Sequence, residues 1–159
     1  MKIRKTSRVI LFNSTAEVLL QRVIPLEPLR SKQSLVWVWI APGGQIEDNE
    51  SIHECAAREL YEETGISDCE FGTILWHGIH ILNLSGEDTV FDEHFVFAKV
   101  HGCHIPSSGD NIGILEQKWW KIEDLVDNKV PTFPVKLPEL LISMQNKSHI
   151  RNLIDINFY

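Results

Sequence analysis

Three glutamates near the middle of the chain have the type and the spacing of a metal-binding site. Glu59, Glu62 and Glu63 stand at positions i, i+3 and i+4, so a helix would gather their side chains on one face. Converging carboxylates repel one another unless a cation neutralises them, and Mg²⁺ and Mn²⁺ prefer such oxygen ligands. The alternative is an acidic helix that faces solvent, because most runs of charge are simply solvated.

The negative charge of the chain is concentrated around these glutamates. Of the net charge of −7, the segment 44–66 carries −6, from seven acidic residues and the single base Arg58. A divalent cation bound there would offset this charge and would also attract a phosphate group. The sequence has no basic stripe of the kind that binds nucleic acids, so we expect no nucleic-acid partner.

The bulk composition indicates one globular domain. The 159 residues are 43% hydrophobic, which is typical of a soluble domain of this length. No apolar run approaches the roughly 20 residues of a membrane helix, and the apolar run 9–12 is shorter than the core of a signal peptide, about 7–15 residues. We therefore expect a cytoplasmic protein without a membrane partner. The three cysteines, Cys55, Cys69 and Cys103, are expected to be reduced and structural.

Local sequence signals place the three glutamates on a helix. Ser51 and Glu54 have the spacing of a capping box, and Gly65 follows where a left-handed C-cap is favoured. The pattern predicts a helix over 51–64. Its face toward a sheet is expected to contain Ile52, Ala56, Ala57, Leu60 and Thr64.

Strand and turn signals surround this helix. They predict strands at 9–13, 18–23, 35–41, 70–82, 93–101 and 116–121, with loops at 25–34, 85–88 and 104–113. Pro42, Gly43 and Gly44 break the third strand, and shorter helices are expected at 122–127 and 136–144. The segment 146–159 has too weak a pattern to be placed. Strands interleaved with helices favour an α/β fold, with a mixed sheet covered by helices.

The segment 44–66 resembles the Nudix box, G-x5-E-x7-R-E-U-x-E-E-x-G-U, where U is a bulky aliphatic residue. A chance match anywhere in a chain of this length has a probability of roughly one in ten million at average residue usage. The resemblance implies an α/β/α sandwich with a mixed central sheet and the box as a loop–helix–loop. It also implies one domain over 1–159, with a core at about 8–145 and a C-terminal tail at 146–159. The matching residues are Gly44, Glu50, Arg58, Glu59, Leu60, Glu62, Glu63, Gly65 and Ile66.

The resemblance assigns roles to individual residues. Glu59, Glu62, Glu63 and the backbone carbonyl of Gly43 are the implied ligands of Mg²⁺, with Mn²⁺ as the second choice. Glu50 and Arg58 look like the pair that fixes the loop onto the helix, in a framework completed by Gly44 and Gly65.

A water activated by the metal or by a glutamate would attack phosphorus. The catalytic set is Glu59, Glu62, Glu63, Arg58 and Glu116; the identity of the general base stays open among Glu59, Glu63, Glu116 and Glu93. Arg22 and Gly44 are the candidates for contact with the substrate.

Aromatic residues and histidines carry weaker signals. Trp37, Trp39 and Trp76 are candidates to stack on a nucleobase, although a place in the core is favoured for each. His77 and His80 would point to opposite faces of a strand, and the seven histidines show no ligand spacing.

The favoured function is hydrolysis of a pyrophosphate linkage in a small nucleoside diphosphate derivative. A nucleoside triphosphate is the first choice of substrate and a nucleotide sugar the second. The alternatives are a nucleotide-sensing Nudix domain without turnover and an isomerase of the same fold. The intact box and the lack of further catalytic residues argue against these two. A homodimer is an expectation from the family alone.

Overall fold

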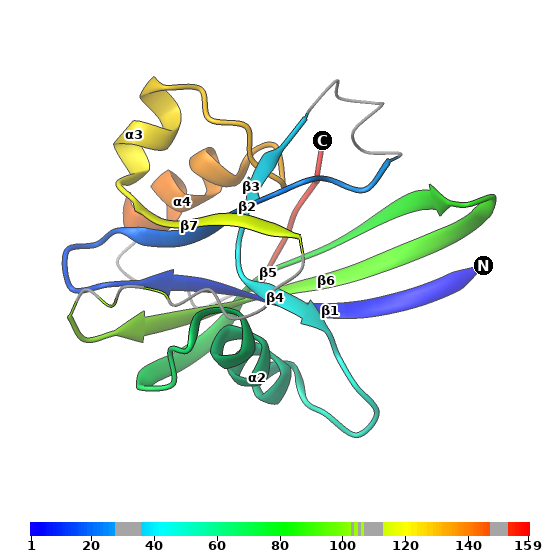
Figure 1. Ribbon diagram of the computed structural model, residues 1–159, viewed down its shortest axis with the longest axis horizontal. Coiled ribbons are helices and arrows are strands. Elements are labelled where there is room, and N and C mark those ends of the chain that lie inside the picture. The colour runs from blue at the N-terminus through cyan, green and yellow to red at the C-terminus, as the bar shows by residue number, and fades with distance from the viewer. Residues whose placement is uncertain (28–35, 103, 105, 107–112, 147–152) are drawn as a thin grey trace.

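The computed structural model describes residues 1–27, 36–102, 104, 106, 113–146 and 153–159 (Figure 1). Its strands form one sheet of order β3-β2-β1-β6-β5-β8, with β4 paired to β1 and β7 paired to β2. The pairs β1·β6 and β5·β8 are parallel and the others are antiparallel, so the predicted mixed sheet is confirmed. The strands are β1 Lys2–Phe12, β2 Val18–Val23, β3 Val38–Ile40, β4 Gly43–Gln45, β5 Cys69–Leu84, β6 Glu87–Val100, β7 Ile114–Trp120 and β8 Ile154–Asp155.

Helices cover both faces of this sheet, as the predicted α/β/α sandwich requires. Helix α2, Ile52–Thr64, packs Ala56 and Leu60 on one face, in a core cluster with Val9 and Val96. Helices α3, Ile122–Asp127, and α4, Leu137–Asn146, lie over the other face and add Leu125 to its core. Two separate cores therefore hold the sheet in place, and α2 is fixed by the smaller of them.

Helix α2 begins and ends where the sequence predicts. The Ser51 side chain accepts a hydrogen bond from the Glu54 backbone while Glu54 accepts one from the Ser51 backbone, and Gly65 adopts a left-handed conformation with φ 74°. The expected buried face is corrected at one position: Ala57 is exposed, and Cys55 is buried in its place. The apolar stripe is rotated toward Cys55 because this side of the helix faces the loop that precedes it.

Several strands differ in length from the prediction. Strand β1 begins at Lys2 because its polar first half pairs in parallel with β6, which residue alternation does not reveal. The third strand is shorter, at Val38–Ile40. The break at Gly43 and Gly44 is itself a short strand, held by the ladder that it forms with Ser7 and Arg8.

The β5–β6 hairpin and the first half of β1 extend together beyond the other strands (Figure 1), since Lys2 pairs with Thr89 near the hairpin turn. Its turn is at Ser85 and Gly86, which both have positive φ, 54° and 89°, as a type I′ hairpin turn requires. The C-terminal segment, which the sequence did not place, contributes β8 and the fully buried side chain of Phe158. The predicted loops at 25–34 and 104–113 fall largely outside the described residues.

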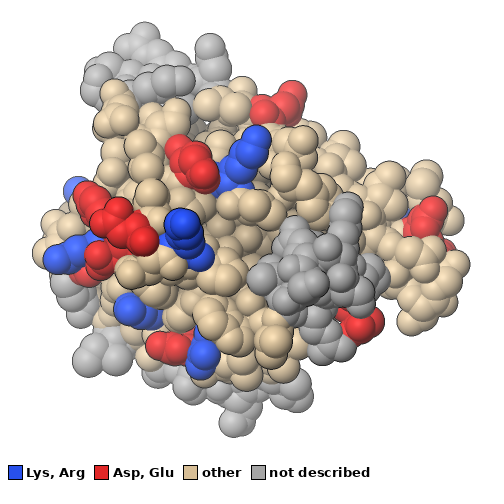
Figure 2. Space-filling model, turned by 90° about the horizontal axis from the view of Figure 1, so that it is seen from above, with Lys and Arg blue, Asp and Glu red and all other residues tan. Residues whose placement is uncertain are grey.

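The surface carries charges of both signs. Figure 2 shows one face of the molecule on which Lys and Arg side chains are interspersed with Asp and Glu. Within the described part of the chain, no helix has the length and apolar character needed to cross a membrane.

Candidate active site

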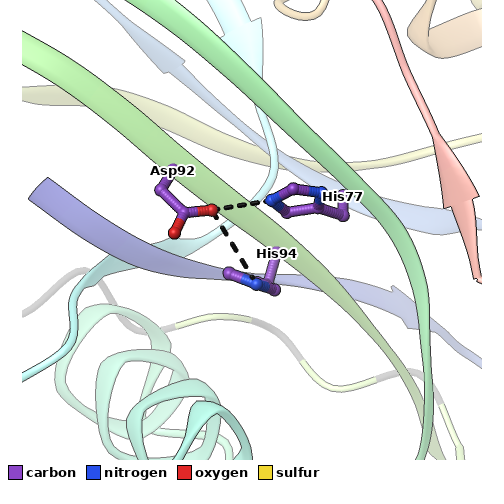
Figure 3. Close-up of side chains that lie close together, drawn as sticks. All are labelled: His77, Asp92 and His94. Atoms are coloured by element: carbon purple, nitrogen blue, oxygen red, sulfur yellow. Dashed lines mark hydrogen bonds and ion pairs between the residues drawn. The ribbon is translucent and has the colours of Figure 1, made fainter.

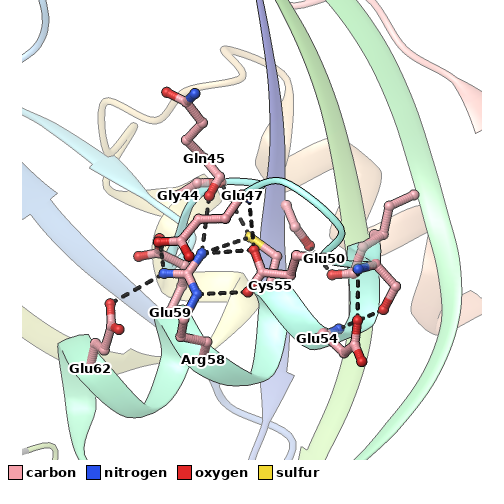
Figure 4. Close-up of polar contacts among 12 residues, drawn as sticks. Gly44, Gln45, Glu47, Glu50, Glu54, Cys55, Arg58, Glu59 and Glu62 are labelled. Carbon is pink, nitrogen blue, oxygen red and sulfur yellow. Dashed lines mark hydrogen bonds and ion pairs between the residues drawn. The ribbon is translucent and has the colours of Figure 1, made fainter.

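Arg58 joins the loop before α2 to the helix itself (Figure 4). Its Nε donates to Glu50 Oε1 at 2.7 Å and its Nη2 donates to Glu50 Oε2 at 2.9 Å, so the contact is bidentate. Nη2 also donates to the carbonyl of Gln45 at 3.1 Å. One guanidinium therefore holds both ends of the loop 45–50 against α2.

The same guanidinium orients two of the three glutamates. Arg58 Nη1 donates to Glu59 Oε1 at 2.8 Å and to Glu62 Oε2 at 3.3 Å. The Glu59 carboxylate lies directly against Gly44, so that a methyl group at that position would overlap it. The Glu62 side chain is half exposed, whereas that of Glu59 is only 16% exposed. Glu59 and Glu62 are therefore held side by side at the edge of the loop.

Glu63 lies deeper than the other two glutamates. Its Oε2 accepts hydrogen bonds from the backbone N–H of Gly43 and from Gln21 Nε2, both at 3.0 Å. Burial raises the pKa of Glu63 to about 7, although the charge of Arg8 and these two hydrogen bonds oppose the rise. Glu63 and Glu59 thus lie against the Gly43–Gly44 backbone, and Glu62 is linked to Glu59 through Arg58.

Arg8 on β1 is a site residue that the sequence analysis missed. Its Nη1 donates to the carbonyl of Gly43 at 3.3 Å and to that of Ala41 at 3.4 Å, and its Nε lies 3.6 Å from Glu93 Oε2. The signal was an arginine placed directly before the apolar run 9–12 of β1. A charge in such a position is costly unless it has partners, and Arg8 has three.

Arg8 also borders a cavity of about 120 Å³, lined by residues of β1, β2, β3, β5 and β6, by residues 24–26 and by Phe133. Most of its lining is apolar, and its polar residues are Arg8, His80 and Glu93. Burial alone would raise the pKa of Glu93, but the charge of Arg8 and the hydrogen bond to His80 outweigh it and hold the pKa below its usual value. Glu93 is therefore an anion enclosed beside the loop that carries Gly43.

Arg22 and Glu116, named from the sequence for different roles, contact each other. They are opposite in the register of β2 and β7, and Arg22 Nε lies 3.3 Å from Glu116 Oε2. The Arg22 guanidinium also lies over the Trp37 ring, 5.5 Å from its centroid. Trp39 and Trp76 belong to the core, as the favoured interpretation held.

Cys55 fills the space between the loop and α2. It is fully buried, and its Sγ lies 3.7 Å from both the Gly44 carbonyl and Arg58 Nη2. Burial raises the pKa of the Cys55 thiol to about 12. Cys55 and Cys69 are free thiols, and Cys103 lies outside the described residues.

The histidines bring a correction. His77 and His80 do point to opposite faces of β5, since His77 packs on His94 and His80 packs on Phe91. The absence of a ligand spacing was misleading, however, because β5 and β6 bring His77, Asp92 and His94 together (Figure 3). His77 and His94 are 17 positions apart in the sequence and meet because β5 pairs with β6, which the spacing of residues within one strand does not reveal.

Neighbouring glycines in the loop should respond to alanine in different ways. Gly43 has φ 149° and its added methyl group would overlap the backbone of Ser7 and Arg8, so Gly43→Ala should cost about 3 kcal/mol or more. Gly44→Ala would displace only the end of the Glu59 side chain, so stability should fall by less than about 1 kcal/mol while kcat falls about 100-fold. Urea unfolding and kcat on the best substrate measure both effects. A stable, fully active Gly44→Ala variant would contradict the prediction.

Glu50 should make the protein sensitive to acid. The hydrogen bonds from Arg58 lower the pKa of Glu50 from 4.5 to about 2. Because the folded pKa is the lower one, Glu50 stabilises the fold above pH 4.5, and this contribution is lost as the pH falls toward 2. Urea unfolding at about pH 5.5 and about pH 3 should show a smaller loss of stability in Glu50→Gln than in the wild type. An equal loss of stability in Glu50→Gln and in the wild type would show that the Glu50 carboxylate does not cause the sensitivity to acid.

Taken together, these features define an α/β/α sandwich with a carboxylate-lined loop and helix. A family model described as the NUDIX domain matches residues 2–141, and the chain belongs to this family.

Known relatives agree with this assignment. A Caenorhabditis elegans protein that carries the name nudix hydrolase 1 is 29% identical over 100 residues, which are 63% of this chain and 25% of that protein. The chain thus matches about a quarter of the length of that relative.

Two solved structures share the fold at low identity. The C. elegans Ap4A hydrolase is 17% identical with a TM-score of 0.62, covering 90% of this chain and 96% of that one. The ADP-ribose pyrophosphatase of Streptococcus suis is 14% identical with a TM-score of 0.63, covering 96% and 98%.

Proposed function

We propose that this chain is a divalent-metal-dependent hydrolase that cleaves the pyrophosphate linkage of a small nucleotide. The observation that carries the proposal is the arrangement of the three glutamates: Glu63 and Glu59 lie against the Gly43–Gly44 backbone, and Arg58 joins Glu62 to Glu59. Carboxylate oxygens and a backbone carbonyl form a donor set that suits Mg²⁺ and also accepts Mn²⁺. The residues present therefore fit a hard divalent cation.

In this proposal Glu59, Glu62, Glu63 and the carbonyl of Gly43 hold the cation. When bound, Mg²⁺ would neutralise charge on the phosphate oxygens and lower the pKa of a water molecule. Arg58 positions Glu59 and Glu62 and holds the loop through Glu50. Gly65 ends the helix just after the last glutamate, so the carboxylates stay on its final turns.

The general base is assigned to the box, to Glu59 or Glu63, because these carboxylates lie beside the proposed cation, where the attacking water would be bound. Contact with an arginine does not separate the candidates, since Arg58 engages Glu59, Arg8 engages Glu93 and Arg22 engages Glu116. Glu93→Gln and Glu116→Gln should accordingly retain more activity than Glu59→Gln or Glu63→Gln.

A nucleotide is the favoured substrate class, first a nucleoside triphosphate and then a nucleotide sugar. The apolar cavity beside Arg8 would accept part of a nucleoside, and Arg22 and the backbone at Gly44 would contact phosphate. The fold alone does not choose the leaving group, since structures named for Ap4A and for ADP-ribose resemble it to the same degree.

The test is release of phosphate or pyrophosphate from nucleoside triphosphates, nucleotide sugars and dinucleotides, each with Mg²⁺, with Mn²⁺ and with a chelator. Turnover that requires a divalent cation supports the proposal, and the best substrate identifies its class. Binding of nucleotides without turnover of any compound would overturn it in favour of a nucleotide sensor.

A further inference from the structure

A group of metal-ligand side chains lies outside the Nudix box, on the β5–β6 hairpin (Figure 3). His77 on β5 is directly opposite His94 on β6, and Asp92 stands two residues before His94. Because side chains alternate along a strand, Asp92 and His94 project from the same face of the sheet. Figure 3 shows the three side chains pointing toward one another.

The distances within this group are those of a site close to its metal-bound form. His77 Nε2 lies 2.7 Å and His94 Nε2 lies 3.9 Å from Asp92 Oδ1, and the ligand atoms all lie within 4.8 Å of one another. Ligands about 2.1 Å from a tetrahedral ion are about 3.4 Å apart. Small rotations of the side chains would therefore bring all three donors to one ion.

The surroundings of His77 resemble those of a metal-ligating imidazole. Asp155 Oδ1 lies 3.1 Å from His77 Nδ1, the nitrogen on the other side of the ring from Asp92. A carboxylate at this position fixes the orientation of a ligand histidine and makes its other nitrogen a better donor. Asp155 reaches it because β8 pairs with β5 in a register that sets Asp155 beside His77.

His94 supplies a second, independent observation. Its Nδ1 is buried and has no hydrogen-bond partner within the described part of the chain, although its side chain packs on the His77 ring at 4.8 Å between centroids. An unpaired buried nitrogen is unfavourable in a ring that serves only to fill space. A neutral imidazole can bind a cation through either ring nitrogen, so a cation at Nδ1 would supply the partner that the described part of the chain does not provide there.

This group is distinct from the carboxylates of the box. Ser7 pairs with His94 in the β1–β6 register and donates to the carbonyl of Ile52, the first residue of α2. The group therefore lies beside the beginning of the helix, whereas Glu59, Glu62 and Glu63 lie on its last turns. The ligand types also differ: two imidazoles and one carboxylate favour Zn²⁺ and similar ions, while Mg²⁺ prefers oxygen alone.

We propose that His77, Asp92 and His94 form a second metal site, which binds one Zn²⁺ or a similar transition-metal ion independently of the box. Asp155 is its positioning residue. Since β5 supplies one ligand, β6 two, and β8 the supporting carboxylate, an ion bound there would tie the C-terminal strand to the hairpin. The proposal does not depend on the proposed hydrolase activity.

The test is calorimetric titration of the full chain with Zn²⁺ in a large excess of Mg²⁺, which occupies the box, together with the visible spectrum of bound Co²⁺. We expect one equivalent of Zn²⁺ in the wild type and in Glu62→Gln/Glu63→Gln. Binding should weaken by more than about 100-fold in His77→Gln and His94→Gln, and by about 10-fold in Asp155→Asn. His101→Gln is the matched control, because His101 is an exposed histidine whose Nε2 lies 3.6 Å from Glu70.

The outcomes separate clearly. If both His77→Gln and His94→Gln still bind one equivalent, or if the wild type binds none in excess Mg²⁺, the second site does not exist. Loss of binding only in Glu62→Gln/Glu63→Gln would assign the ion to the box. Circular dichroism of each metal-free variant shows whether it is folded. If His94→Gln is not folded, His94→Asn is used in its place. Because hydrolysis is not measured, failure of this proposal leaves the proposed function unaffected.

Discussion

Glu63→Gln should reduce kcat by about 10²–10⁴-fold and leave the fold intact. Glutamine has the same size and still accepts hydrogen bonds from Gly43 and Gln21, so the local packing is retained. What is lost is one negative charge at the deepest of the three carboxylates. Removal of one ligand charge from a catalytic cation costs several kcal/mol of transition-state stabilisation, at 1.36 kcal/mol for each factor of ten in rate.

The matched control is Glu54→Gln on the same helix. Glutamine can replace glutamate in a capping box, so this variant makes the same substitution without touching the site. Steady-state kinetics with Mg²⁺ should show wild-type kcat for Glu54→Gln. Near-wild-type kcat in Glu63→Gln would remove Glu63 from the catalytic set, whatever its burial.

Arg58→Ala should lower the free energy of unfolding by about 2–3 kcal/mol and nearly abolish activity. The variant leaves Glu50, Glu59 and Glu62 without their shared cation and frees the loop from the helix. The expected cost lies below the 3–5 kcal/mol of a fully buried pair, because Arg58 is 25% exposed and solvent screens part of the interaction. For a chain of this length, the melting temperature should fall by about 5–10 °C.

Two further variants separate charge from geometry. Arg58→Lys keeps the positive charge but cannot make the bidentate contact with Glu50, so it should recover only part of the stability. In the double variant Glu50→Gln/Arg58→Ala the cost should be smaller than the sum of the single costs, because the two residues interact directly. Arg4→Ala, which removes an exposed hydrogen bond to Gln45 and a cation–π contact with Phe91, should change stability by no more than about 1 kcal/mol. Additive costs at Glu50 and Arg58 would contradict their coupling.

The box could be predicted from the sequence because its determinants are local. The capping residues, the i, i+3 and i+4 glutamates and the C-cap glycine all lie within one helix and its flanks, so spacing alone defines their geometry. The order of elements predicted a mixed sheet covered by helices, and the resemblance to the Nudix box implied the α/β/α layers.

The residues that sequence reasoning missed depend on pairing between distant strands. Arg8 meets Gly43 only because β4 pairs with β1, and His77 meets His94 only through the β5–β6 register. The length of β1 was underestimated for the same reason, since backbone ladders can hold a polar strand that has no alternating pattern. Arg22 and Glu116 were each recognised as notable, but their contact required the β2–β7 register.

The reactivity of the Cys55 thiol reports how often the loop 45–50 separates from α2. Its thiol is enclosed between the Gly44 carbonyl and Arg58, so an alkylating reagent can reach it only when the loop separates from α2. The rate at which the peptide containing Cys55 is labelled therefore measures how often that separation occurs. A cation that bridges the loop and the helix should slow the labelling, and weakening of the Arg58 contacts should speed it. The motion of the loop can thus be followed without introducing a probe.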